Sequence, residues 1–212
     1  MKTLSRLGLL LCVLVAGCIS SSPPSRFYNL TPFVAEAEQD SFDVPSELVG
    51  VGPIHLPRYL MRPQMVTRTD GNRMIIDEFA RWADGLDLQA GRAITENLTL
   101  LCGPTLFLPF PWRDDFKPDL RLIADVTRFE ANTDGVVELD IRWAIARPRT
   151  GTRLSVHESR YRSPADASDP GSVAAGMSDV IAQLSRDAAA ALKAAGEEAA
   201  VAGGEAQQVP GG

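Results

Sequence analysis

The chain has 212 residues, of which 45% are hydrophobic and 23% charged, and its formal net charge is −6. This length is enough for one domain, and the composition is ordinary for a globular protein. The acidic balance argues against binding of nucleic acid and against a polybasic grip on anionic lipid headgroups.

Residues 1–17 have the order of a secretory signal peptide. Basic, apolar and small residues follow one another: Lys2 and Arg6, then the run of residues 7–15, then Ala16 and Gly17. Cys18 comes directly after the small pair, which is unusual in a plain secretory signal and typical of a lipoprotein signal. The apolar run is too short for a transmembrane helix, which needs about 20 residues. We therefore predict cleavage before Cys18.

Cys18 is the predicted lipidation site. A cysteine of this kind carries a diacylglyceryl group and an amide-linked acyl chain, and two or more chains are needed for stable anchoring. The next two residues, Ile19 and Ser20, are the predicted sorting residues. In enteric-type bacteria, an aspartate directly after the lipidated cysteine retains a lipoprotein in the inner membrane, and this chain has Ile19 at that position. Ile19 therefore favours the outer membrane. Residues 18–25, with Pro23 and Pro24, are predicted to form a lipidated polar tether.

Cleavage changes the net charge from −6 to −8, because Lys2 and Arg6 leave with the signal. Cys12 leaves as well and Cys18 is lipidated, so Cys102 stands alone in the mature chain and no intramolecular disulfide can form. We interpret Cys102 as a small buried hydrophobic residue rather than a reactive thiol.

The predicted domain covers residues 26–195. A short first strand is expected over residues 26–30, followed by an acidic loop or mobile arm over residues 31–46. A second strand, broken near Pro53, is expected over residues 48–56. Two further strands, at residues 65–69 and 73–79, are predicted to form a hairpin across Asp70-Gly71-Asn72.

Apolar residues at helical spacing predict a helix over residues 86–101, with Gly103 as its stop. Residues 105–112 favour an edge strand. Three more strands are expected at residues 119–130, 137–145 and 152–162, of which the middle one alternates most clearly and the last has the polar face of an edge.

A second helix is predicted to begin at Pro170, capped by Asp169, and to end at Gly196. Residues 196–212 are rich in Ala, Gly, Glu and Gln and are predicted to be a disordered tail. These elements indicate an α+β single domain, with a mostly antiparallel sheet and two amphipathic helices packed on it.

No catalytic or metal-binding pattern stands out. The two histidines, His55 and His157, are each isolated, and no zinc, nucleophile-elbow or phosphate-loop motif is present. Asp77-Glu78 and Asp114-Asp115 are adjacent pairs, whose side chains point to opposite faces of a strand, so solvated loops explain them better than a cation site. We expect no catalytic residue, no metal and no cofactor.

Two stretches are candidate contact surfaces. Residues 106–112 would form an apolar patch if exposed, but a covered edge strand is the favoured interpretation. The turn over residues 59–64, with Arg81-Trp82, carries the residue types common at interfaces. A rigid turn that packs Tyr59 and Trp82 into the core explains that second stretch equally well.

Several short motifs follow one another along the chain: Val51-Gly52-Pro53, Leu56-Pro57, Tyr59-Leu60, Arg62-Pro63-Gln64, Arg81-Trp82, Asp125-Val126, Arg128-Phe129-Glu130 and the strand with Trp143. In this order they resemble the Pqi C-type lipoproteins, also called ABC-transport auxiliary lipoproteins. The similarity runs from about residue 26 to residue 192. The loop after Thr31 and the Ala/Gly-rich tail lie outside it.

The resemblance implies an outer-membrane lipoprotein of an intermembrane lipid-transport system, on the periplasmic face, that is not an enzyme. It implies an inner-membrane transport component and an MCE-domain tunnel protein as partners, with a homo-oligomeric ring as one arrangement. In this interpretation Cys18 anchors the chain. The partner-binding candidates are Arg58, Tyr59, Arg62, Gln64 and Trp82.

Two other functions stay open on the sequence alone. A lipid-anchored periplasmic enzyme acting on the cell wall predicts a cleft with paired carboxylates. An assembly lipoprotein predicts an outer-membrane β-barrel as partner.

Overall fold

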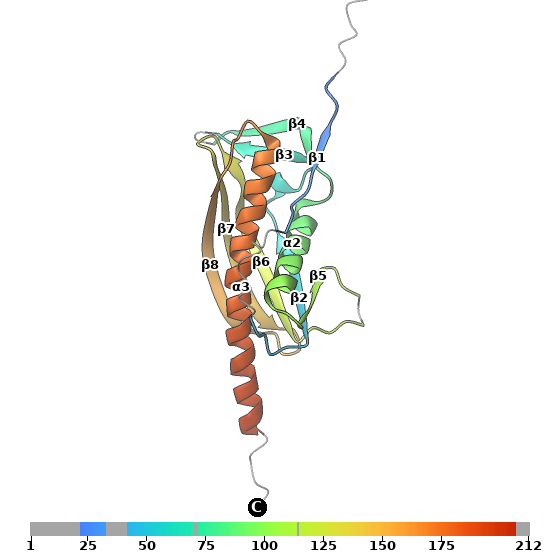
Figure 1. The fold of residues 1–212 in the computed structure, drawn as a ribbon, viewed down its shortest axis with the longest axis vertical. Helices are drawn as coiled ribbons and strands as arrows, with labels where there is room; N and C mark the ends of the chain where they lie inside the picture. Colours follow the sequence, from blue (N-terminus) through green and yellow to red (C-terminus); the bar gives the residue numbers. More distant parts are fainter. Residues whose placement is uncertain (1–21, 33–41, 70–71, 114, 207–212) are drawn as a thin grey trace, which may run out of the picture.

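The computed structural model describes residues 22–32, 42–69, 72–113 and 115–206, with side chains described as far as residue 197. Within these residues eight strands form one sheet, and the two α-helices lie together on one face of it (Figure 1). The predicted α+β single domain with two helices on a mostly antiparallel sheet is confirmed.

The longest ladders are antiparallel and join β6 (Leu120–Asn132), β7 (Val136–Arg147) and β8 (Thr152–Pro164). Apolar and polar residues alternate strictly along β7, which explains its position at the centre of these three strands, between β6 and β8. Its apolar side chains face the helices and are almost fully buried: Val137, Leu139, Ile141, Trp143 and Ile145. Among the described strands β8 pairs only with β7, so it is an edge strand, as predicted.

The other edge of β6 is shared by two strands, and we call this division the fork. β2 (Leu48–His55) runs parallel to the first half of β6, and β3 (Gln64–Arg68) runs parallel to its last two residues. β5 (Leu106–Pro109) extends the sheet beyond β2 as a parallel edge strand. The sheet is therefore mixed, although antiparallel pairing supplies its long ladders.

The remaining strands extend the sheet beyond β3. β4 (Met74–Trp82) forms the predicted hairpin with β3, and β1 (Arg26–Tyr28) pairs in parallel with β4. Two residues of the predicted hairpin turn, Asp70 and Gly71, lie outside the described residues.

β2 was expected to break near Pro53, but it continues through it. The Gly52–Pro53 peptide bond is cis, Gly52 has φ +114°, and the register against β6 shifts between Val51 and Ile54. Glycine is the residue that best tolerates a positive φ, so the strand bends here instead of ending.

Helix α2 (Leu86–Leu101) has the predicted bounds, and Gly103 follows its end with φ +65°. Helix α3 (Pro170–Ala206) begins as predicted. The Asp169 carboxylate accepts backbone N–H groups of Gly171 at 2.9 Å and Ser172 at 3.2 Å, which satisfies donors of the first turn.

The predicted end of α3 at Gly196 is wrong, because the helix continues to Ala206. A β-carbon at Gly196 would lie 2.6 Å from side-chain carbons of Pro45. Glycine is therefore needed here for a close contact, and the Ala- and Glu-rich residues that follow are good helix formers. The predicted disordered tail is thus helical in its first part, and residues 207–212 lie outside the described residues.

The segment after residue 41 is also more ordered than a mobile arm. The Phe42 backbone N–H donates to the Leu101 carbonyl at 2.8 Å, and Val44 is buried in the core. Residues 33–41 of this predicted loop lie outside the described residues.

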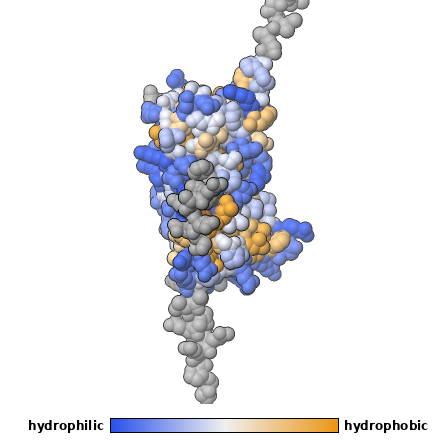
Figure 2. All heavy atoms as spheres, viewed as in Figure 1, coloured by the Kyte–Doolittle hydropathy of each residue, from blue (hydrophilic) through white to orange (hydrophobic). Residues whose placement is uncertain are grey.

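The two ends of the described chain leave from opposite poles. β1 lies at one pole, and the last turns of α3 project from the other (Figure 1). Figure 2 shows hydrophilic and hydrophobic residues mixed on this side of the molecule, with hydrophobic ones gathered beside α2 and β5. Exposed side chains in that area include Leu100, Leu106 and Phe110.

Candidate functional site

The turn that joins β2 to β3 contains most of the predicted partner-binding residues. It begins with a short 3-10 helix, η2 (Arg58–Leu60), whose Leu60 is buried in the core. The turn lies at the fork, where β6 pairs with β2 as far as Asp125 and with β3 only from Ala131.

Tyr59 joins this turn to the sheet. Its hydroxyl donates to Glu130 Oε2 at 2.8 Å, and Arg68 Nε donates to Glu130 Oε1 at 2.7 Å. The Phe129 N–H also donates to Glu130 Oε2, at 3.0 Å. We call Tyr59, Arg68 and Glu130 the fork network. The Glu130 side chain is 1% exposed, so its charge is buried but supplied with donors.

Burial and the neighbouring Glu130 carboxylate together raise the pKa of Tyr59 to about 12. Both causes disfavour the phenolate, because it would lie without water beside an existing negative charge. Tyr59 therefore acts as a neutral hydrogen-bond donor that fixes the turn.

A second set of charges extends the fork network across the helix-free face. Glu138 is the direct cross-strand neighbour of Glu130, and this pair of like charges needs compensation. Arg128 donates a hydrogen bond to Glu138 and lies 4.0 Å from Glu130, and Arg162 lies 2.8 Å from Glu138. The positive and negative side chains on this face therefore compensate one another.

The predicted contact residues divide into exposed and buried ones. Arg58 and Arg62 are exposed, while Gln64 is half-buried and donates to Glu78 Oε2 at 3.2 Å. Trp82 is only 5% exposed and belongs to the core, so its side chain offers almost no surface to a partner. Among the proposed residues, the free contact surface is that of Arg58 and Arg62. The turn adds Met61, which is 57% exposed.

Sequence reasoning assigned no role to Arg68 or Glu130. Arg128-Phe129-Glu130 is one of the motifs that carry the family resemblance, which by itself indicates no role for Glu130. The one signal available was an acidic residue between Phe129 and Ala131, both of which face the core. Its partners Tyr59 and Arg68 are 71 and 62 residues away, which no local pattern reveals.

The apolar stretch over residues 106–112 is partly covered. Phe107 is buried, but Leu106 is 53% and Phe110 44% exposed. The rings of Phe110 and Trp112 meet edge to face at 5.3 Å. The Trp112 ring lies over Gly50 and the β-carbon of Phe110 lies over Gly52, so a β-carbon added at either glycine would collide with these atoms. The favoured interpretation of a covered edge strand is therefore correct for Phe107 but not for Leu106 and Phe110.

Two of the isolated polar candidates, His157 and Asp77, occupy structural positions. His157 stacks on Trp143 with ring centroids 4.0 Å apart. Asp77 Oδ1 accepts the N–H groups of Phe79 and Ala80. Within the described part of the chain, no group of three or more His, Cys, Asp or Glu is arranged to hold a metal ion.

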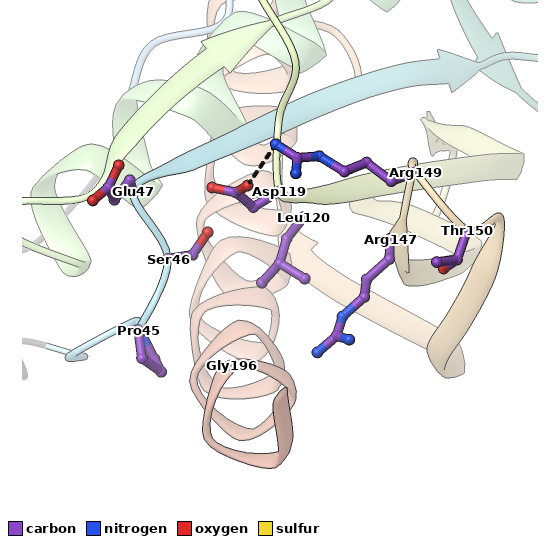
Figure 3. Close-up of a pocket in the computed structure, with 9 residues that line it drawn as sticks. All are labelled: Pro45, Ser46, Glu47, Asp119, Leu120, Arg147, Arg149, Thr150 and Gly196. Atoms are coloured by element: carbon purple, nitrogen blue, oxygen red, sulfur yellow. Dashed lines mark ion pairs between the residues drawn. The ribbon is translucent and has the colours of Figure 1, made fainter. Parts of the chain in front are cut away.

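A hollow of about 600 Å³ lies at the pole from which α3 projects (Figure 3). We call it the far-pole pocket. It is lined by Pro45, Ser46, Glu47, Asp119, Leu120, Arg147, Arg149, Thr150 and Gly196. Arg149 and Asp119 form an ion pair across its rim at 3.7 Å, and Leu120 forms part of its apolar wall.

The predicted lipidation and sorting residues, Cys18, Ile19 and Ser20, lie outside the described residues. Among the helices that are described, none is long and apolar enough to cross a membrane. Cys102 is fully buried, and burial raises the pKa of its thiol to about 12, which agrees with an inert core cysteine.

Two solved structures have the same fold. A protein from Xanthomonas campestris is 15% identical, with a TM-score of 0.65 over 82% of this chain and 99% of its own. An uncharacterised protein is 19% identical, with a TM-score of 0.58 over 81% of this chain and 97% of its own. No curated protein matches the chain.

The family model that matches this sequence describes the ABC-type transport auxiliary lipoprotein component. The match spans residues 28–189, which includes every strand from β2 to β8, helix α2, the fork network and the first part of α3. The chain belongs to the family of ABC-type transport auxiliary lipoproteins.

Proposed function

We propose that this lipoprotein is anchored in the outer membrane and docks an MCE-domain tunnel protein in a system that moves lipid between the two membranes. The observation that carries the proposal is the family match over residues 28–189, together with the predicted lipoprotein signal peptide over residues 1–17 that precedes Cys18. Its role is that of an adaptor and not of an enzyme.

The anchor is the diacylglyceryl group and acyl chain on Cys18, and Ile19 directs the protein to the outer membrane. The tether of residues 18–25 can span at most about 29 Å when fully extended. β1 follows this tether, so its pole is the one held near the membrane (Figure 1). The opposite pole, with the far-pole pocket, points into the periplasm.

Docking uses the turn fixed by the fork network. Tyr59 holds the turn against Glu130, while Arg58 and Arg62 remain exposed to solvent. Two cations on a rigid turn suit an acidic partner surface, because charge complementarity guides encounter and fixes orientation.

Crosslinking in cells, followed by a mild-detergent pull-down and mass spectrometry, tests the proposal. Recovery of an MCE-domain protein and an inner-membrane transport component is expected with the natural chain. Recovery of a β-barrel, or of the lipoprotein alone, would overturn the proposal in favour of an assembly or enzymatic role.

A double charge reversal, Arg58→Glu with Arg62→Glu, tests the docking turn in the same pull-down. We expect it to reduce recovery of the partner while leaving cooperative unfolding intact. Arg142→Glu is the matched control, because Arg142 is exposed and, among the described residues, forms an ion pair only with the exposed Glu158. Equal recovery from both variants would place docking on another surface.

The anchor is tested separately by metabolic labelling with palmitate and by membrane fractionation. Cys18→Ser should abolish the label and release the chain from the outer-membrane fraction. Label that persists in Cys18→Ser would contradict the assignment of the lipidation site.

A further inference from the structure

The far-pole pocket lies between the layer of helices and the sheet. Gly196 of α3 and Pro45 form one side, the ends of β6 and β7 form the other, and the turn between β7 and β8 closes the rim (Figure 3). Its volume of about 600 Å³ falls in the range of sites for small organic molecules. No part of the proposed docking turn contributes to it.

Arg147 places a positive charge at this pocket, and it has no partner among the described residues. It is half-buried at the end of β7, on the same face as the fully buried Ile145. No described residue forms an ion pair or hydrogen bond with its side chain, and Figure 3 shows its guanidinium directed into the hollow. A half-buried cation that lacks a counterion favours an anion beside it.

The two acidic residues of the lining do not neutralise Arg147. Asp119 faces Arg149 across the rim, and the carboxylate of Glu47 points away from Arg147 in Figure 3. Arg149 is 72% exposed and lies 3.7 Å from Asp119, so this loose pair leaves its guanidinium free to turn toward a bound anion.

Ser46 supplies an unused hydrogen-bond donor. Its hydroxyl oxygen is buried and has no hydrogen-bond partner in the described part of the chain. A buried polar group without a hydrogen-bond partner lowers the stability of the fold, so its presence on a pocket wall points to a ligand that accepts its hydrogen bond. The Ser46 hydroxyl and the Arg147 guanidinium project from opposite sides of the hollow (Figure 3).

We propose that the far-pole pocket binds the phosphate group of an amphiphilic anion. A phosphate has several oxygens that accept hydrogen bonds in different directions, so it can reach Ser46 on one wall and Arg147 on the other. Pro45 and Leu120 supply apolar surface for the carbon atoms next to the phosphate. The source of the phosphate is a glycerophospholipid headgroup or free phosphate.

The test is isothermal titration calorimetry on residues 18–212 with Cys18→Ser, which removes the lipid but keeps the whole mature chain. The two probes are dihexanoyl phosphatidylglycerol, below its micelle concentration, and inorganic phosphate. Saturable binding of the lipid that is much tighter than that of phosphate assigns the pocket to a headgroup. Equal binding of both assigns it to free phosphate, and absence of saturable binding for both overturns the proposal.

Variants connect the binding to the pocket. Arg147→Gln should weaken binding by about tenfold or more, because it removes a charge-assisted hydrogen bond. Arg147→Lys should lie between Arg147→Gln and the natural chain, since it keeps the charge but loses the planar fork. Ser46→Ala should weaken binding by a smaller factor.

Arg142→Gln is the control, because it removes an equal charge from the helix-free face, where Arg142 pairs with Glu158. Cooperative thermal unfolding of each variant must match that of the natural chain. If Arg147→Gln binds as tightly as Arg142→Gln, the anion lies elsewhere and the proposal fails. This result leaves the pull-down of an MCE-domain protein unaffected, so the two proposals fail independently.

Discussion

The fork network and the far-pole pocket each contain a half-buried arginine, yet only the arginine of the fork network has a carboxylate partner among the described residues. Arg68 forms an ion pair with the buried Glu130 at 2.7 Å, and the Tyr59 hydroxyl donates a hydrogen bond to the same carboxylate. Arg147 has no such partner among the described residues, and the buried Ser46 hydroxyl on the opposite side of the pocket has no hydrogen-bond partner among them either. The comparison teaches that a satisfied polar cluster serves the fold, while an unsatisfied one is available to a ligand.

The strongest test of the fork network is Glu130→Ala. This change leaves the half-buried Arg68 and Tyr59 without their acceptor, so the free energy of unfolding should fall by about 3 kcal/mol. Urea denaturation with a fitted m value measures it. Glu158→Ala, at an exposed ion pair, is the control and should change little. Equal effects of the two changes would show that the network adds nothing to stability.

Tyr59→Phe removes a single hydroxyl from the same network. The loss of its hydrogen bond to Glu130 should lower the free energy of unfolding by about 1 kcal/mol. Tyr28→Phe is the matched control, because the Tyr28 hydroxyl has no partner in the described residues. A stable Tyr59→Phe that nevertheless loses the transport partner would make Tyr59 a contact residue instead.

Alkaline pH should reduce the stability advantage of the natural chain over the Tyr59→Phe variant. The pKa of Tyr59 is raised to about 12 by burial and by Glu130, whereas an unfolded tyrosine titrates at about 10. Between these two values the folded state binds more protons, so stability falls as pH rises. The advantage is complete below pH 10 and is lost as pH approaches 12.

Guanidinium denaturation of the natural chain and of Tyr59→Phe, at several pH values from 9 upward, measures this convergence. The difference between the two chains cancels contributions from the other titrating groups. A difference that stays constant through pH 11 would contradict the neutral-donor role of Tyr59.

The smallest effect is expected at the wall of the far-pole pocket. Gly196→Ala gains about 1 kcal/mol of helix propensity, but the new methyl group meets Pro45 at 2.6 Å. The two terms oppose each other, so thermal denaturation should show little net change. Binding of the phosphate probe should weaken, because Pro45 and Ser46 must shift.

Gly91→Ala in α2 is the control for Gly196→Ala. The nearest atom to its new β-carbon is 3.9 Å away, in Ile54, which is ordinary contact. It should therefore gain stability from helix propensity alone. If Gly196→Ala gains as much as Gly91→Ala, the contact with Pro45 does not constrain the pocket wall.

Local patterns predicted the elements of this fold well, because period and capping are local properties. Helix α2 and the alternation of β7 follow directly from the spacing of apolar residues. The direction in which strands pair is not local. The parallel pairing of β2 and β3 with β6 depends on connections through other elements, and alternation is the same for either direction.

The candidate site was predicted less completely for a related reason. The turn from Arg58 to Gln64 was found by its residue types, but residue type did not separate the buried Trp82 from the exposed Arg62. Gly196 shows the same ambiguity, since a glycine that ends a helix and one that allows a close contact look alike in sequence. Contacts between distant segments decide both cases.

The edge strands of the sheet have a consequence for copies of this lipoprotein crowded together on a surface. An exposed strand edge is a template on which a neighbouring chain can add a strand and start an aggregate. On β5, Pro109 offers no N–H at the free edge, and β8 carries Arg153, Glu158, Arg160 and Arg162. These residues discourage strand addition, so a high local density of molecules remains compatible with solubility.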